Sequence, residues 1–237
     1  MSAVTTAASL VIFPVLAGAI GGAVAVIRAP SASVVSGVQH LAAGIVLAAV
    51  AGEVLPELRE QGPLWLIVLG FTAAVALLLV MSRFEDHGES ASGALPVGFL
   101  VVVGVDLAID GLLVGASAAV NTETATVITV ALTAEVLFLG LAVALQLTRA
   151  GVSRVGAAAI TAGLSLVVGV GAIVGAALLT DASPAVLTLV LAFAAAALLW
   201  LVVEELLVEA HETPDRPWMA ALFFVGFLAL FSLEALG

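Results

Sequence analysis

Apolar stretches of about 20 residues, separated by short polar breaks, account for almost the whole chain, and this is the length a helix needs to cross a bilayer. The stretches are residues 7–27, 34–57, 63–83, 95–120, 124–148, 153–179, 184–209 and 217–236. Hydrophobic residues make up 63% of the sequence and charged residues 10%, whereas about a quarter of a soluble domain is charged. The sequence therefore predicts an all-α polytopic membrane protein with eight transmembrane helices in one domain, residues 1–237.

All six basic residues are arginines, and their positions predict the orientation of the chain. Arg59 lies in the second loop, and the other five lie in the first, third, fifth and seventh loops, at Arg28, Arg83, Arg149, Arg154 and Arg216. Because cytoplasmic loops carry the excess of basic residues, both termini are expected outside. We expect the protein in the plasma membrane, with the lipid bilayer as its surroundings.

The charge balance and the missing residue types exclude several functions. Acidic residues outnumber basic ones by 17 to 6, which argues against nucleic acid or an anionic substrate as a partner. The chain has no cysteine, so a bound metal would have oxygen or imidazole ligands. It has no HExxH, GxSxG or P-loop motif, and we therefore expect no enzyme, no ATP coupling and no catalytic cofactor.

Two aspartates interrupt the fourth apolar stretch, which reads "FLVVVGVDLAIDGLLVGASAAV" over residues 99–120. Asp106 and Asp110 are four residues apart, so they lie on the same face of a helix. An ionised side chain in the middle of a bilayer costs several kcal/mol unless a partner, water or a cation compensates it. Two carboxylates on one face of a spanning helix therefore indicate a functional site within the membrane.

The fifth stretch contains one acidic residue, Glu135, and its depth matches that of Asp110. Asp110 lies about 15 Å below the outer end of its helix near Val120, at about 1.5 Å per residue. Glu135 lies at a similar depth below Thr124, where the next helix begins. The short loop between them makes the two helices antiparallel neighbours. We therefore expect Asp106, Asp110 and Glu135 to converge near mid-membrane.

Three crowded carboxylates need a neutralising species, and neither of the two stretches contains a basic residue or a histidine within it. A divalent metal ion fits this need, because such ions bind carboxylate oxygens. Protons or a monovalent cation are the alternative. A third possibility is that one or more of these acids stay protonated and only form hydrogen bonds between helices.

A short frame, E-x-L-x-E, occurs at the ends of the second and seventh stretches, in "AGEVLPELRE" and "VEELLVEAHE". It contains Glu53 and Glu57 in one copy and Glu205 and Glu209 in the other. The two helices run in opposite directions, so one frame faces the outer side and the other the inner side. This arrangement predicts two inverted three-helix units around a central helix pair, a 3+2+3 bundle typical of secondary transporters. Glu53 and Glu57 are then a candidate outer entrance.

The two acidic helices resemble one transporter family. "DLAIDGLLVGASAA" resembles the "HNxPDGLAIGAA" segment of the ZIP (ZRT/IRT-like) metal-ion transporters, and "EVLFLGLAVAL" resembles their "HEIPEGLAIGL". Eight helices, outward termini and the polar loop "SRFEDHGESASG" are similar to that family as well. The resemblance implies a permease that moves divalent metal ions into the cytoplasm, with zinc, manganese or iron as substrate.

Carried over by position, the resemblance implies that Asp106, Asp110 and Glu135 form the central metal site. Other ligand positions of the family are occupied by apolar residues here, namely Leu107, Val136 and Leu139. We therefore expect at most one bound metal ion, held by carboxylates alone. Without imidazole, the preference for zinc over manganese or iron should weaken.

The resemblance also suggests an inner release site at the end of the seventh helix. The candidates there are Glu204, Glu205, Glu209 and His211, with His40 at the start of the second helix. The alternative for the four residues on the seventh helix is an ordinary solvated helix end, and for His40 an interfacial histidine.

Glycine content divides the predicted helices into two sets. Helices one, four and six contain closely spaced glycines, which permit tight packing, whereas helices two, three, seven and eight contain more Leu, Phe and Trp. This division resembles the transport and scaffold units of the ZIP family. It implies an elevator-type motion of helices one, four, five and six past the rest, and a homodimer formed through the scaffold.

Three functions remain open after this reading. A divalent-metal permease is favoured. A proton- or monovalent-cation-coupled carrier is the alternative, and an intramembrane enzyme is the third, for which no catalytic motif is found.

Overall fold

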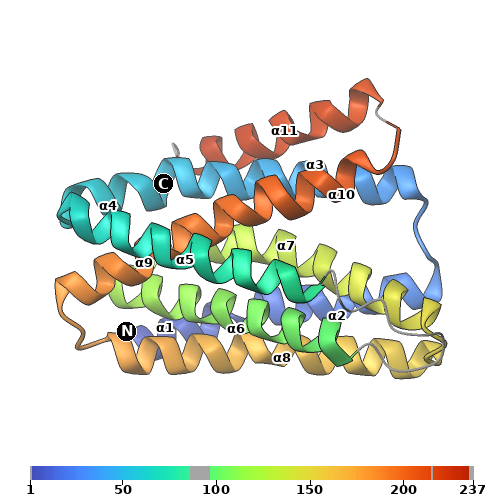
Figure 1. The fold of residues 1–237 in the computed structure, drawn as a ribbon, viewed down its shortest axis with the longest axis horizontal. Coiled ribbons are helices and arrows are strands. Elements are labelled where there is room, and N and C mark those ends of the chain that lie inside the picture. Colours follow the sequence, from blue (N-terminus) through green and yellow to red (C-terminus); the bar gives the residue numbers. More distant parts are fainter. Residues whose placement is uncertain (1, 86–96, 215, 235–237) are drawn as a thin grey trace.

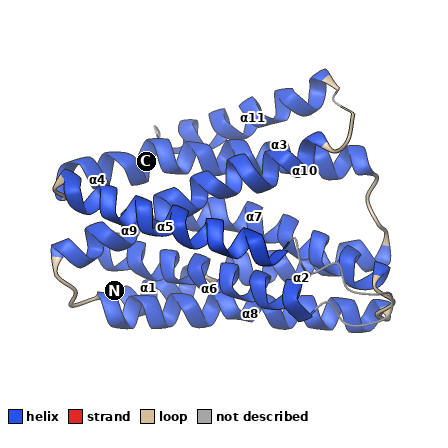
Figure 2. Cartoon of the chain, viewed as in Figure 1, coloured by secondary structure: helices blue, strands red, loops and turns tan. Residues whose placement is uncertain are grey.

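Helices joined by short turns and loops make up the computed structural model, which describes residues 2–85, 97–214 and 216–234 and has no strand within them (Figures 1 and 2). Within these ranges, seven helical segments are long and apolar enough to cross a membrane. The segment predicted as the eighth is also an apolar helix, but its apolar part, Pro217–Leu233, is shorter. Most of the polar loop "SRFEDHGESASG" lies outside the described residues. A polytopic helical membrane protein, the class predicted from sequence, is therefore confirmed.

The helices begin and end close to the predicted boundaries. Their bounds are α1 Ala3–Leu10, α2 Ile12–Ile27, α3 Ala32–Ala49, α4 Leu55–Gln61, α5 Leu64–Glu85, α6 Val97–Val120, α7 Thr122–Arg149, α8 Arg154–Leu179, α9 Pro184–Trp200, α10 Leu207–His211 and α11 Pro217–Glu234. The first span extends over α1 and α2 with a break at Val11. Pro14 explains this break, because its ring clashes with the carbonyl of Leu10 four residues earlier.

Side-chain caps mark the starts of four of the described helices, the first of them α1, where Ser2 accepts a hydrogen bond from the Thr5 backbone N–H. Asn121 accepts a hydrogen bond from the Thr124 backbone N–H at the start of α7, and Ser153 and Ser183 cap α8 and α9 in the same way. Each cap satisfies a backbone N–H that has no partner within its helix. Gly151, in the turn between α7 and α8, has φ of 90°, which favours glycine.

Two of the long spans contain a wider, π-helical segment, and these were not expected from the sequence. The first, η1 (Val50–Val54), joins α3 to α4, and the second, η2 (Leu201–Leu206), joins α9 to α10. They include Glu53 and Glu205, the first glutamates of the two E-x-L-x-E frames. π-Helical segments occur frequently at functional sites.

The helices pack as two groups (Figure 1). In one, which we call the α7 group, α1, α2, α6, α7 and α8 pack on one another. In the other, the α3 group, α11 and α10 pack against α3, and α5 packs along α9. The groups meet where α7 lies against α3 and where α6 lies against α5 and α9.

Close packing through glycine occurs in both groups and not only in the helices for which it was predicted. A Cβ atom added to Gly44 of α3 would lie 2.0 Å from the Phe223 carbonyl oxygen of α11. Only a glycine fits at such a backbone contact. The aromatic-rich α11 is therefore held to α3 by the same means that join the helices of the α7 group.

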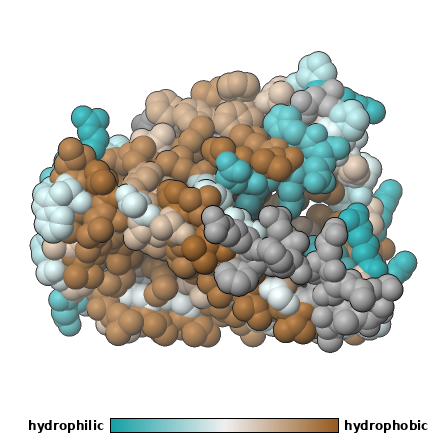
Figure 3. Space-filling view, viewed as in Figure 1, coloured by the Kyte–Doolittle hydropathy of each residue, from teal (hydrophilic) through white to brown (hydrophobic). Residues whose placement is uncertain are grey.

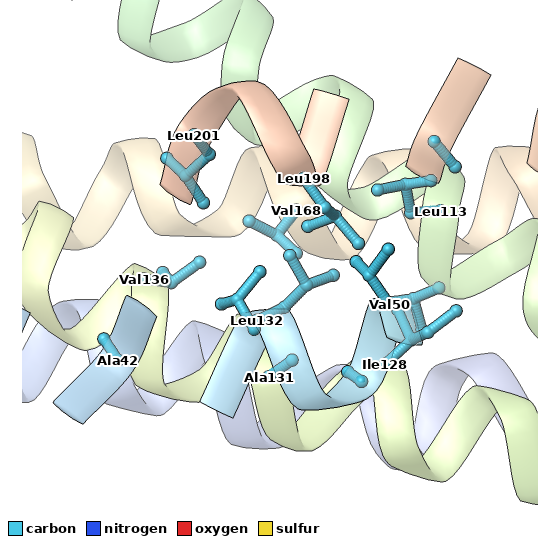
Figure 4. Packing of buried hydrophobic residues seen from close by; sticks show 14 of the residues in the cluster. Ala42, Val50, Leu113, Ile128, Ala131, Leu132, Val136, Val168, Leu198 and Leu201 are labelled. Carbon is cyan, nitrogen blue, oxygen red and sulfur yellow. The ribbon is translucent and has the colours of Figure 1, made fainter. Parts of the chain in front are cut away.

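Buried apolar side chains fill the boundary between the two groups. Figure 4 shows Leu132 of α7 and Val168 of α8 close to Leu198 of α9, all three of them buried. The outer surface is also apolar over most of the face in Figure 3, with hydrophilic side chains toward the ends and over η2 and α10. A bundle with apolar residues both inside and outside is expected where the surroundings are lipid.

Candidate cation site

Three carboxylates converge between α6 and α7, as predicted from their depths. Asp106, Asp110 and Glu135 each place one oxygen so that all three oxygens lie within 4.8 Å of one another. A search of the described residues for three or more acidic or histidine side chains close enough to hold one metal ion finds these three. The two helices are neighbours because only Asn121 separates them.

The cluster is largely closed to its surroundings. Asp110 is 4% exposed and Glu135 is 2% exposed, whereas Asp106 is half-buried. One oxygen of each buried acid, Oδ2 of Asp110 and Oε2 of Glu135, has no hydrogen-bond partner in the structure. A buried polar atom without a partner is costly, so these two oxygens indicate that a proton or a cation belongs to the site.

The backbone that carries Asp110 is held by close packing against α8. A Cβ atom added to Gly111 would lie 2.3 Å from the Val168 carbonyl oxygen and 2.8 Å from the Ala172 nitrogen. The glycine lets the two backbones touch. Asp110 is therefore positioned by the contact of its helix with α8 as well as by its own side chain.

Glu205, in the α3 group, adds a fourth acidic charge that acts on this cluster. It lies in η2 and is half-buried, and its carboxylate interacts electrostatically with those of Asp110 and Glu135. The sequence placed Glu205 with the inner residues Glu209 and His211. The structure adds that its charge also acts on the central cluster.

At the end of the bundle near the α6–α7 turn, η1 is joined to α7 by a side-chain hydrogen bond. The buried hydroxyl of Thr124 donates to Oε1 of Glu53 at 2.6 Å. This bond connects the α3 group to the α7 group. Glu57, the other predicted entrance residue, is half-buried in α4.

Replacing Thr124 by valine tests this connection, because the two side chains have nearly the same shape. We expect Thr124→Val to lower the free energy of unfolding by about 1.5–3 kcal/mol, the usual contribution of a hydrogen bond to a charged group. Thr126→Val is the control, since the Thr126 hydroxyl is exposed and bonds only to the Thr122 carbonyl of its own helix. Chemical denaturation of both variants in micelles gives the comparison, and equal effects would contradict the role of this bond.

The opposite end of the bundle brings together most of the predicted inner residues. The His40 and His211 rings lie 5.3 Å apart between centroids, and Gln39 Nε2 donates to Glu209 Oε2 at 2.8 Å. His40 is buried and its Nδ1 lies 2.8 Å from the Ser36 carbonyl oxygen. Glu204, in contrast, is exposed. His40, Glu209 and His211 thus form one polar contact between α3 and α10.

Sequence reasoning missed Gln39, Thr124 and the π-helical segments. Gln39 stands beside His40 in a helix whose other polar side chains are serines, and this polar pair is a signal that could have identified it. Thr124 carries no such signal, because many threonines in these helices bond to their own backbone, as Thr129 does.

Fold and site together define a helical membrane protein with a buried carboxylate cluster between two of its spans. Comparison of the chain with models of known protein families gives no match, and comparison with curated proteins gives none either. The function is therefore argued from the site itself.

Proposed function

We propose that this protein is a permease for divalent metal ions of the zinc, manganese or iron class, with the central carboxylates as the transport site. The observation that carries the proposal is the pair of buried, unpartnered oxygens on Asp110 and Glu135. The proposal includes the ZIP-like architecture expected from sequence, with eight spans, a 3+2+3 repeat and both termini outside.

The spacing of the cluster suits a single ion. Two carboxylate oxygens that each lie about 2.2 Å from one zinc ion are at most about 4.4 Å apart. The oxygens of Asp106, Asp110 and Glu135 lie within 4.8 Å of one another, so only small adjustments would let all three bind one ion. Oxygen ligands without imidazole favour the harder divalent ions.

The grouping of the helices supports an elevator-type motion in this proposal. All three acidic residues belong to α6 and α7, and both helices belong to the α7 group. A rigid α7 group could therefore move with its ion past the α3 group. Glu205, from the α3 group, would then lie near the ion in one position of the α7 group and far from it in another. The proposed homodimer would form through the α3 group.

A proton- or monovalent-cation-coupled carrier is the second candidate. The same unpartnered oxygens favour it, because two adjacent carboxyl groups can share a proton. In this case the carboxylates change protonation during transport and bind no metal.

Flux into proteoliposomes distinguishes the two candidates. We expect the wild-type protein to move Mn²⁺ or Zn²⁺, followed with an indicator enclosed in the vesicles, at a rate that saturates with metal concentration. A pH-sensitive dye in parallel vesicles reports proton movement without metal. Proton flux with no metal flux would replace the first function by the second, and vesicles without protein give the background.

A further inference from the structure

A hollow of about 360 Å³ lies between α5, α6 and α9, and none of the three clustered carboxylates lines it. Every residue that lines it is apolar. The lining comes from both helix groups, with Leu69, Gly70 and Ala73 on α5, Leu189, Val190 and Phe193 on α9, and Ile109, Leu112 and Leu113 on α6.

The three walls lie at the same depth in the bundle. The residues on α5 and α9 lie five to nine residues after the helix starts at Leu64 and Pro184, and those on α6 lie seven to eleven residues before its end at Val120. At about 1.5 Å per residue, the hollow is roughly 8–16 Å below the helix ends. In a hydrocarbon layer about 30 Å thick, this depth is within reach of lipid chains and not of water.

The hollow is open on one side. Leu69 is 52% exposed and Leu112 is 37% exposed, whereas Leu113 at the back is 2% exposed. The bundle surface around it is apolar (Figure 3). Its opening therefore faces the medium that surrounds the spans.

The chemistry of the lining selects the occupant. Water is not stabilised in a cavity without polar partners, whereas apolar cavities of about 150 Å³ bind molecules as large as benzene. An empty hollow more than twice that size would lose the dispersion contacts of its walls. The flexible hydrocarbon tail of a neighbouring lipid supplies these contacts.

We propose that the hollow between α5, α6 and α9 binds one acyl chain of a membrane lipid. The chain contacts the α3 group through α5 and α9 and the α7 group through α6. Ile109, one of its contacts, directly precedes Asp110. The lipid is therefore a ligand of the boundary between the two groups, and this binding does not depend on the transport function proposed above.

Lipid retention in detergent tests the proposal. We expect the purified wild-type protein to keep about one lipid per chain in native mass spectrometry after delipidation. Ala73→Phe places a ring in the hollow and should reduce retention about tenfold, because the ring occupies the volume of several methylene groups. Ala229→Phe on α11 is the control, since Ala229 is also exposed on a spanning helix but does not line the hollow.

A fluorescence titration gives a second measurement that does not require a filled hollow. Trp65, Trp200 and Trp218 are replaced by phenylalanine, and Phe193→Trp then reports from the wall. Phosphatidylcholine with brominated chains, added to the micelles, should quench this tryptophan with saturation near one lipid per chain. Phe224→Trp, at a side chain that is 64% exposed, should be quenched only in proportion to the lipid content of the micelle.

Three outcomes would overturn the proposal. One is equal retention by wild type and Ala73→Phe, with all variants eluting as folded protein in size-exclusion chromatography. Another is quenching of Phe193→Trp that follows the Phe224→Trp control. The third is a wild-type protein that retains no lipid and is oligomeric, together with an Ala73→Phe variant that is monomeric. This result would show that a second copy of the chain covers the hollow.

Discussion

Asp110→Asn is expected to abolish metal binding and metal flux while leaving the fold intact. Asparagine has nearly the same shape, but it removes the charge and one oxygen from a site made only of carboxylates. Changes that merely touch the partners of a metal ligand cost about 10–100-fold in affinity, so loss of a ligand should cost at least about 100-fold. Without metal, the variant should be no less stable than wild type, because Asp110 carries a buried oxygen with no partner.

Thermal unfolding with and without metal measures both effects in one experiment. Metal at 100 times its dissociation constant should stabilise the wild-type protein by about 2.7 kcal/mol, and this gain should vanish in Asp110→Asn. Asp181→Asn is a matched control, because Asp181 is exposed in the turn after α8. If Asp110→Asn kept the metal-dependent stabilisation, Asp110 would have no part in the site.

Gly111→Ala is expected to have the second large effect, through packing and not through chemistry. The added methyl group would lie 2.3 Å from the Val168 carbonyl oxygen, and a backbone atom cannot turn aside as a side chain does. Overpacking of this kind costs typically about 1–3 kcal/mol. The two helices must separate to relieve it, and Asp110 moves with α6. We therefore expect a lower melting temperature together with a weaker metal-dependent stabilisation.

Gly104→Ala is the matched control on the same helix. A Cβ atom there would meet only Leu164 Cδ2, at an ordinary 3.8 Å. Alanine is the better helix former, so this variant should gain about 0.4–1 kcal/mol in stability. Denaturation of both variants in the same micelles gives the comparison. A Gly111→Ala protein as stable as Gly104→Ala would show that α6 and α8 are not held as closely as described.

Helix positions and the central cluster could be predicted because both depend on spacing along the chain. A spanning helix needs a fixed number of apolar residues, and the depth of a side chain follows from its distance to the helix end. These two rules placed Asp110 and Glu135 at one level, and the structure brings their oxygens together. The resemblance to the ZIP family, the metal, the orientation and the homodimer remain predictions.

The amino-acid sequence by itself determined that the chain is a helical membrane protein and that its few buried acids would meet, since hydrophobicity and helical rise are local properties. Only the tertiary structure decided which partners those acids have, because the direction of a side chain depends on how each helix is rotated against its neighbours. The two π-helical segments illustrate the difference: Glu205 of η2 interacts electrostatically with Asp110, and Glu53 of η1 accepts a hydrogen bond from Thr124, and neither contact follows from spacing along the chain. The lipid-facing hollow likewise exists only because three helices from two groups leave a space that no single stretch of sequence encodes.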